Sequence, residues 1–362
     1  MENKDVKEIM ELVENGNVDA IYELAIRNYY GYGMEKNYTE AFNLFFDAAN
    51  KGNINAKYML ALCYYNGFGT KQNYEKALEI FNNLIKEYDN EDSKYMLGYS
   101  LYNGYGMEKN YTEAFKIFKK LSDDGDMDAR YYLARMYYFS EGVTENNEIA
   151  FQLFNDVFNN NQDEDAKYFI GEMKYLGLGT NQDYKGAFEI FNSLCDEDRR
   201  AKQKIATMYC DGNYVERDYN KAFEYFSELA NDGNDIDGID NYMLSVMYYD
   251  GLGTDKQMEK SFEYMLKAAE KGNSDAQFWV AYKYFHGEGT QQSDEETEKW
   301  LIKSVKQNNA MAQWFLGILY LEGKENDIKI EENKEYGIKL LKKSAEQGYE
   351  EAIKKLKEID NI

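Results

Sequence analysis

The chain has 362 residues, of which 44% are hydrophobic and 30% are charged, and its formal net charge is −24. Such acidity argues against a nucleic-acid partner, because phosphate backbones are bound through lysine and arginine, and anionic membrane surfaces would repel the chain. The charge favours solubility of a long, exposed molecule, and the alternative is that it attracts a basic partner.

Cysteine usage and the absence of long apolar runs indicate the compartment. Cys63, Cys195 and Cys210 form neither a CxxC motif nor an even, spaced framework, which is typical of a reducing environment. The first 16 residues hold no run apolar enough for a signal peptide, and no stretch approaches the roughly 20 apolar residues of a membrane span. We therefore expect a cytoplasmic protein that does not insert into a membrane.

Residues 1–17 are predicted to form an N-terminal capping helix. Val6, Ile9 and Val13 follow helical spacing, and Gly16 can end the helix in a left-handed conformation. This helix would cover the apolar face of whatever follows it, as the ends of stacked repeats require.

Residues 18–351 consist of nine copies of one unit. The string GYGMEKNYTEAF occurs unchanged at 31–42 and at 104–115, and close variants lie between and after these two. A fixed period of about 36 residues predicts a solenoid, in which each unit buries its apolar face against its neighbours. The units open at Ala20, Ala56, Ser93, Ala129, Ala166, Ala201, Asp240, Ala276 and Ala312. Residues 352–362 would form a C-terminal capping helix.

Each unit is predicted to form a helix, a turn and a second helix. In the first helix the fifth residue is aliphatic and the sixth is small, as in Leu97 and Gly98, so that a second helix can approach closely. The turn carries Gly-x-Gly, whose first glycine ends the helix where φ is expected to be positive. Gly104→Val should therefore cost roughly 1–2 kcal/mol or more. Asn110 begins the second helix as its N-cap, and Glu113 stands at capping-box spacing.

Two insertions interrupt the rhythm. Residues 231–240, NDGNDIDGID, add about three residues to the period and contain four aspartates with no basic residue. They do not form a calcium loop, because Gly233 and Leu244 would fall where acidic ligands are needed. Residues 324–333 lengthen the turn of the ninth unit. Sequence drift explains both insertions, and a functional role is the alternative.

The pattern A-x-Y-x-L-G/A-x-x-Y-Y-x-G-x-G, followed by D/N-x-x-x-A-x-x-x-F, resembles the Sel-one-like repeat, a relative of the tetratricopeptide repeat. The fullest matches open at Ala56, Ser93 and Asp240. The resemblance implies an all-α, right-handed superhelical α-solenoid of nine helix-turn-helix repeats whose first helices line a concave face. It also implies an adaptor that assembles protein complexes. Some units depart from the pattern, which puts their local geometry in question: Ser140, Tyr214, Glu325 and Gly337.

The sequence offers little for catalysis. His286 is the only histidine, which argues against multi-histidine metal sites, and its place at the end of a first helix suits a structural role. The Gly-x-Gly turns are not phosphate loops, because no GK[ST] follows them. We therefore expect no enzyme activity and no cofactor or metal.

The candidate binding residues belong to the first helices. The third residue is aromatic in eight units, and by analogy with tetratricopeptide repeats it would face the groove; the alternative is that these rings only pack the repeats together. Seven of these residues are candidate contacts: Tyr58, Tyr95, Tyr131, Tyr168, Tyr242, Phe278 and Trp314. The seventh residue varies and would provide selectivity, with solvated surface charge as the alternative. The candidates are Tyr99, Arg135, Glu172 and Tyr282.

These observations favour a non-catalytic scaffold that binds a protein or peptide, which could be basic, in its concave groove. Tyrosine suits this role because it gives a large contact area and a hydroxyl group at low entropic cost. One alternative is a binder or hydrolase of β-lactam-like small molecules, as in the cysteine-rich branch of the resembled family, although the paired cysteines of that branch are missing here. The other alternative is an architectural, self-assembling solenoid.

Overall fold

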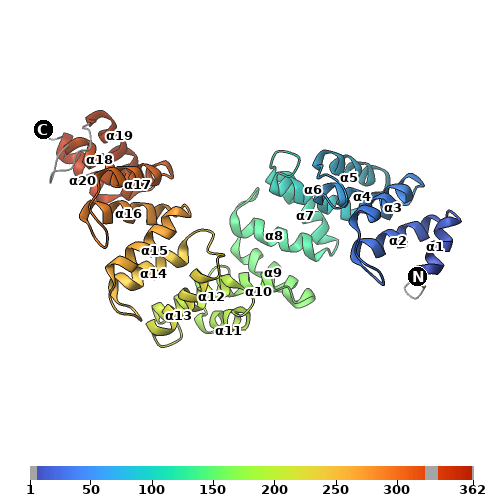
Figure 1. The fold of residues 1–362 in the computed structure, drawn as a ribbon, viewed down its shortest axis with the longest axis horizontal. Coiled ribbons are helices and arrows are strands. Elements are labelled where there is room, and N and C mark those ends of the chain that lie inside the picture. Colours follow the sequence, from blue (N-terminus) through green and yellow to red (C-terminus); the bar gives the residue numbers. More distant parts are fainter. Residues whose placement is uncertain (1–5, 323–332, 361–362) are drawn as a thin grey trace. The chain divides into compact units, whose positions relative to one another are not determined.

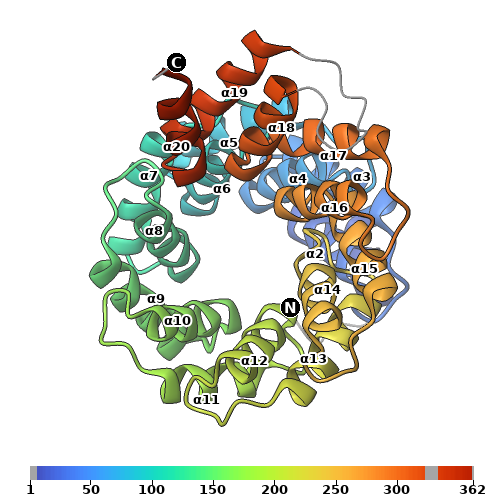
Figure 2. The same cartoon turned by 90° about the vertical axis from the view of Figure 1, so that its left-hand side faces the viewer.

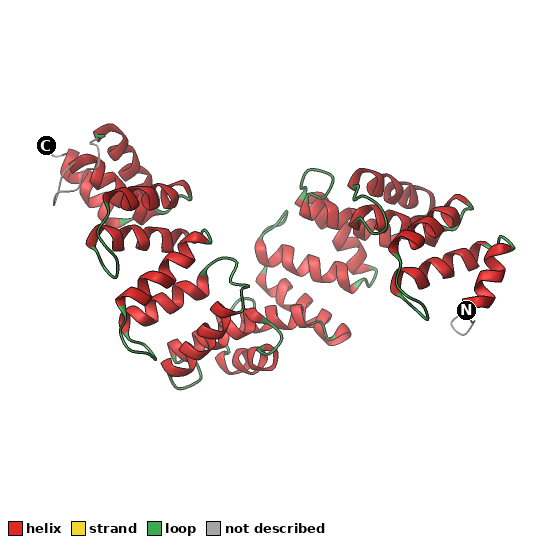
Figure 3. Ribbon diagram, in the orientation of Figure 1, coloured by secondary structure: helices red, strands yellow, loops and turns green. Residues whose placement is uncertain are grey.

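The computed structural model describes residues 6–322 and 333–360, which form twenty α-helices and no strand (Figure 3). The predicted all-α repeat fold is therefore confirmed. Residues 324–332 of the second insertion, with Glu325, lie outside the described residues. The chain divides into two compact units, residues Met1–Asp183 and Tyr184–Ile362, hereafter unit 1 and unit 2.

Unit 1 contains helices α1 to α10 (Figure 1). After α1 (Val6–Glu14), the first and second helices of successive repeats alternate. The first helices are α2 (Val18–Tyr30), α4 (Ile54–Asn66), α6 (Glu91–Asn103), α8 (Met127–Phe139) and α10 (Glu164–Leu176). The second helices are α3 (Tyr38–Asn50), α5 (Tyr74–Tyr88), α7 (Tyr111–Asp123) and α9 (Asn147–Asn161).

Unit 2 contains helices α11 to α20 and begins with the second helix of the fifth repeat, α11 (Tyr184–Leu194). Helices that follow one another pack together, as α14 and α15 do (Figure 2). The first helices are α12 (Arg199–Asp211), α14 (Ile239–Asp250), α16 (Ser274–His286) and α18 (Ala310–Glu322). The second helices are α13 (Tyr219–Asn231), α15 (Met258–Glu270), α17 (Asp294–Lys306) and α19 (Lys334–Glu346), and α20 (Glu350–Asp360) is the last helix described.

The helix ends follow the predicted turn chemistry. In the third repeat, Gly104 ends α6 with φ at 80°, and its N–H donates to Ser100 O. Asn110 Oδ1 then accepts from Glu113 N at 3.1 Å and caps α7. Two departures from the pattern keep this geometry, because Ser140 and Tyr214 adopt φ of 59° and 68° in place of glycine. The turn therefore imposes its conformation even where the residue is unfavourable.

The core of each repeat is a close helix crossing. Six second helices bury an alanine and, four residues later, a phenylalanine with no exposed surface: Phe45, Phe81, Phe118, Phe154, Phe191 and Phe226. The small sixth residue of the first helix makes room for this ring. A Cβ added at Gly98 would lie 3.0 Å from Phe118 Cε1, so the predicted need for a small residue is confirmed.

The second turn glycine joins one repeat to the preceding one, which the sequence did not reveal. A Cβ on Gly106 would lie 2.4 Å from Tyr74 Cβ, and one on Gly69 would lie 2.0 Å from Tyr38 O. These distances are too short for any real Cβ, so the backbone of the turn rests directly on the start of the previous second helix. Glycine suits this contact for two reasons, the positive φ and the missing Cβ, and the exception among the described turns is Tyr214 of the sixth repeat.

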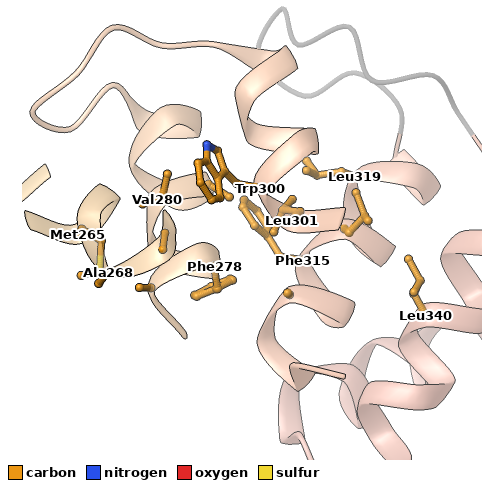
Figure 4. Packing of buried hydrophobic residues seen from close by; sticks show 14 residues of the cluster. Met265, Ala268, Phe278, Val280, Trp300, Leu301, Phe315, Leu319 and Leu340 are labelled. Carbon is orange, nitrogen blue, oxygen red and sulfur yellow. The ribbon is translucent and has the colours of Figure 1, made fainter. Parts of the chain in front are cut away.

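The two ends of the chain differ in what they bury. Ile9 of α1 is buried against Ala20 and Leu24 of α2, in keeping with a capping helix at residues 1–17. Near the other end, the cluster in Figure 4 includes Phe278, Trp300 and residues of α18 and α19. The predicted domain boundaries themselves stay a prediction.

Candidate functional site

The third-position tyrosines of unit 1 pack against the core of their own repeats. The ring centroids of Tyr58 and Tyr95 lie 5.7 Å and 5.9 Å from those of Phe81 and Phe118. Burial raises the pKa of both phenols above the ordinary tyrosine value. These rings are half-buried, so packing between helices explains much of their recurrence, and contact of their free edges with a partner stays a prediction.

Two more third-position residues of unit 1 follow the same pattern. The Tyr131 ring lies 5.9 Å from that of Phe154 and is half-buried. Tyr168 is only 6% exposed and lies with its ring 5.7 Å from that of Phe169. Tyr168 therefore offers less surface to a partner than the other third-position tyrosines of this unit.

Arg135 is half-buried and lies among aromatic rings. Its guanidinium carbon lies 5.7–5.9 Å from the centroids of four rings, those of Tyr102, Tyr131, Tyr132 and Phe139. Its Nε is buried and has no hydrogen-bond acceptor among the described residues. Cation–π attraction to several rings compensates for the water that the guanidinium loses. A simple solvated charge therefore does not describe this residue.

Two tyrosines connect Arg135 to the other seventh-position candidates of unit 1. Tyr132, which faces Arg135, also lies 5.5 Å from the ring of Tyr99. The Tyr138 ring lies 4.8 Å from that of Phe139, one of the rings around Arg135. The Tyr138 hydroxyl donates to Glu172 Oε2 at 3.3 Å. The seventh positions of α6, α8 and α10 thus belong to one connected patch. We call the seven predicted residues of this unit the aromatic surface: Tyr58, Tyr95, Tyr99, Tyr131, Arg135, Tyr168 and Glu172.

The connecting residues Tyr132 and Tyr138 were not predicted as site residues. One signal could have found Tyr132. Four repeats have a single aromatic residue at the third position, whereas four others carry a pair of aromatic residues at the third and fourth positions. The pairs are Tyr131 and Tyr132, Tyr168 and Phe169, Phe278 and Trp279, and Trp314 and Phe315. The second ring of such a pair cannot share the position of the first, so it reaches a different neighbour.

Unit 2 has a cavity of about 360 Å³ between α14, α15 and α16. Its apolar walls come from Tyr242 and Val246 of α14, Met265 of α15 and Trp279 of α16. The predicted site residues Tyr242 and Tyr282 both line it, so two of the candidates of unit 2 meet at one place.

Lys283 is the unexpected member of this cavity. It is 4% exposed, and its Nζ lies 4.5 Å from the centroid of the Tyr249 ring. Burial lowers its pKa from the ordinary lysine value, and the nearby Glu288 carboxylate opposes that shift. Glu288 and Asp250 also line the cavity. Within the described ranges, no hydrogen bond or ion pair of the Lys283 ammonium is seen.

The other candidates of unit 2 lie in its core or at its edge. Phe278 is 4% exposed and belongs to the buried cluster shown in Figure 4. Trp314 is half-buried, with its ring stacked on that of Phe315 at 5.9 Å. His286 ends α16 and its ring centroid lies 4.2 Å from that of Tyr282, so this lone histidine sits beside aromatic residues.

Bases from outside the acidic insertion at 231–240 pair with some of its aspartates. Asp240 is 1% exposed, and Arg199 and Gln203 donate to its carboxylate. Burial raises the pKa of Asp240, and the bonds from Gln203 and Arg199 act against this shift. Lys271 Nζ lies 3.4 Å from the buried carboxylate of Asp235. Two of the four aspartates are thus structural, and the insertion is more than exposed sequence drift.

Residues 6–322 and 333–360 contain no group of three or more histidine, cysteine, aspartate or glutamate side chains placed to hold a metal ion. None of their helices is both long and apolar enough to cross a membrane.

The decisive comparison is with protein-family models. The Sel1 repeat model matches nine segments of the chain: 18–53, 54–82, 92–126, 128–155, 164–198, 200–234, 240–273, 274–309 and 310–349. The chain belongs to the Sel1 repeat family. The fold of Sel1 repeat proteins is typical of non-catalytic scaffolds for protein interaction. No curated protein sequence matched this chain.

Solved structures agree with this assignment. A protective antigen of uropathogenic Escherichia coli strains that displays an SLR fold has 27% identity and a TM-score of 0.65, and the match covers 97% of this chain and 73% of the antigen. A Sel1 repeat protein from Oxalobacter formigenes has 19% identity and a TM-score of 0.59, with 86% and 89% covered. A signal-transduction ATPase with a tetratricopeptide repeat sensor from Pyrococcus horikoshii has 17% identity and a TM-score of 0.55, with 94% and 54% covered. The last two show similarity of fold alone.

Proposed function

We propose that this Sel1 repeat protein is a non-catalytic scaffold that binds a peptide or an extended protein segment on the aromatic surface of unit 1. The observation that carries the proposal is the connected patch at the seventh positions. Tyr99, Arg135 and Glu172 stand at one repeat position on three first helices, and Tyr132 and Tyr138 link them. Half-buried tyrosines with a base and an acid beside them combine contact area with selective charge.

The charge of the patch favours a partner segment that carries basic residues. Glu172 is half-buried, and Glu141 accepts a hydrogen bond from Tyr102 next to Arg135. Arg135 is already surrounded by rings, so its charge is compensated inside the protein, whereas the net charge of the whole chain is −24. A basic side chain of the partner would therefore be attracted both over long range and by Glu172.

The three cysteines support the proposal of a reducing compartment such as the cytoplasm. Cys63, Cys195 and Cys210 are all free thiols, and Cys63 is buried. Burial raises the pKa of Cys63 to about 12, so its thiol is almost entirely protonated near neutral pH. Such a thiol neither forms a disulfide readily nor acts as a nucleophile, in keeping with a structural role.

Peptide selection tests the proposal. The immobilised chain would be panned against a library of random 12-residue peptides, and the peptides that bind would be measured against a triple variant, Tyr99→Ser, Arg135→Gln and Glu172→Gln. The matched control changes the same residue classes on exposed positions of second helices: Tyr88→Ser, Lys119→Gln and Glu148→Gln. Circular dichroism and thermal melting would first establish that both variants fold.

We expect the selected peptides to be basic and to contain an apolar residue. Their affinity for the triple variant should be lower by about tenfold or more, and their affinity for the control should be unchanged. If every selected peptide bound both variants equally, the aromatic surface would not be the binding site. Selection of no peptide, together with concentration-dependent self-association in light scattering, would favour an architectural solenoid instead.

A further inference from the structure

The cavity in unit 2 adjoins the seventh repeat, which lacks the core phenylalanine of the first six repeats. Six repeats place a fully buried phenylalanine four residues after a buried alanine of the second helix. In the seventh repeat these positions hold Met265 and Ser261, and both line the cavity. In the first four repeats the third-position tyrosine packs on that phenylalanine, whereas Tyr242 lines an open space instead.

The helix crossing beside this cavity carries two polar residues, Ser245 of α14 and Ser261 of α15, where most other repeats have apolar ones. Ser245 Oγ donates to the main-chain oxygen of Ser261 at 2.6 Å, and both serines are fully buried. Most repeats place two alanines, or a glycine and an alanine, at this crossing. This hydrogen bond between the two serines stabilises the helix crossing. The hydroxyl of Ser245 therefore does not donate to the charged groups of the cavity.

The charged groups of the cavity are arranged from inside to outside. Lys283 is buried, Glu288 is half-buried and Asp250 is exposed. An ammonium can donate three hydrogen bonds, yet among the described residues Lys283 Nζ has only the face of Tyr249 beside it. Neither carboxylate comes within ion-pair distance of it. The cavity thus presents a positively charged donor that has no acceptor in the described part of the protein, together with two negatively charged acceptors.

We propose that this cavity binds a free α-amino acid with an apolar side chain. The ligand's carboxylate would accept hydrogen bonds from Lys283, its ammonium would face Glu288 and Asp250, and its side chain would lie against Trp279 and Met265. A volume of about 360 Å³ is at the small end of the range for ligand sites, which suits a molecule of this size. This site is independent of the peptide surface proposed for unit 1.

Other small ligands fit the charges less well. A phosphate would bring two negative charges toward Glu288 and Asp250, and a simple cation would face the buried ammonium of Lys283. An uncharged apolar molecule would leave that ammonium unsatisfied, which is costly at a buried site. A zwitterion satisfies both signs of charge at once.

Calorimetry with three related probes tests the assignment. L-phenylalanine carries both charges, N-acetyl-L-phenylalanine lacks the ammonium, and L-phenylalaninamide lacks the carboxylate. L-leucine would be measured beside them as a second amino acid without a ring. We expect both amino acids to bind. Each derivative should bind at least about tenfold more weakly than L-phenylalanine, because each leaves a charged group of the cavity unpaired.

Three variants locate the binding. Lys283→Met removes the ammonium, and Met265→Phe restores the ring that fills this space in other repeats; both should abolish amino-acid binding. The control is Lys267→Met, because Lys267 Nζ also lies 4.5 Å from a tyrosine ring in unit 2 but is exposed and outside the cavity. This control should bind as the unchanged protein does.

Several outcomes would overturn the proposal. One is that neither amino acid binds at a concentration of about 10 mM, which is on the order of the weakest affinities of interest. Another is that L-phenylalanine and L-phenylalaninamide bind equally well. A third is that Lys283→Met binds the amino acids as well as the unchanged protein does. Equal binding of N-acetyl-L-phenylalanine would likewise refute a zwitterion site. None of these results depends on whether unit 1 binds a peptide, so the two proposals can fail separately.

Discussion

Each unit holds a base against aromatic rings, the half-buried Arg135 in unit 1 and the buried Lys283 in unit 2, and the results differ. In unit 1, Arg135 faces four rings, and the phenylalanine cores around it are complete. In unit 2, Lys283 faces one ring, and beside it a repeat has lost its phenylalanine and opened a cavity. The protein itself surrounds the first base, whereas the second stands next to space that a ligand could fill.

This difference shows where a repeat protein can gain a site. The repeat frame has to keep its left-handed turns and its helix crossings, because each unit is held only by its neighbours. A single core position can change without breaking the frame, provided that the loss is local. Exchange of phenylalanine for Met265 is such a change, and it turns a packing position into a cavity wall.

The largest expected effect tests the frame that both units share. Gly106→Ala should lower the free energy of unfolding by about 4 kcal/mol or more, because its Cβ would lie 2.4 Å from Tyr74 Cβ. Gly253→Ala in unit 2 should do the same, since its Cβ would lie 2.1 Å from Tyr219 O. Urea titration measures both.

The first glycine of the same turn provides the control. A Cβ on Gly104 meets only the side chain of Lys109, which can move, so Gly104→Ala should cost about 1–2 kcal/mol from its φ of 80°. Equal losses from Gly104→Ala and Gly106→Ala would show that the close approach between repeats is unimportant.

The sequence was sufficient to predict the frame. The repeat period, the small crossing residues and the turn glycines each leave a mark at a fixed spacing, and the helices of the described residues follow it. The second glycine's contact with the previous repeat was missed, because a close approach between segments about 30 residues apart has no local pattern. That Asp235 and Asp240 find bases on other helices was missed for the same reason.

The candidate sites were predicted only in part. Tyr242 and Tyr282 were chosen for their repeat positions, and they do meet at the cavity, but Lys283 was overlooked because it stands next to a chosen position. The exchange of phenylalanine for Met265 was visible in the sequence. Its consequence depends on whether neighbouring side chains refill the space, and only the packing answers that.

Exchanging phenylalanine and methionine at equivalent core positions of the two units should change the free energy of unfolding in opposite directions. Met265→Phe is expected to raise the free energy of unfolding by about 1 kcal/mol, because it fills the cavity. Phe118→Met in unit 1 is expected to lower it by about 1–2 kcal/mol, since the ring of Phe118 is fully buried against Gly98. Urea titration of both variants would reveal the signs, and a loss of stability in Met265→Phe would mean that the cavity is too narrow for the ring.

Removal of the two bases should have effects of different sign. Arg135→Met is expected to lower the free energy of unfolding by about 1–2 kcal/mol, because contacts with several rings are lost. Lys283→Met is expected to leave it unchanged or to raise it by about 1 kcal/mol, because an ammonium that burial partly deprives of water is replaced by an apolar group. Thermal melting at neutral pH without ligand distinguishes these outcomes, and a strong destabilisation by Lys283→Met would mean that its charge is already satisfied in the free protein.

The smallest effect is a pH dependence that belongs to Lys283 and not to Arg135. Burial lowers the pKa of Lys283 in the folded state, so the unfolded state binds its proton more tightly and this residue costs stability at neutral pH. The cost is relieved as the pH rises through the folded-state pKa toward the ordinary lysine value. The difference in unfolding free energy between the unchanged protein and Lys283→Met should therefore become smaller as the pH rises from about 7 to about 10. This range lies just below the usual pKa of a lysine. Arg135→Met should show no such trend, because a guanidinium keeps its proton throughout that interval. A constant difference for Lys283→Met would mean that the ammonium is as well solvated as in the unfolded chain, and it would remove the contrast between the two bases.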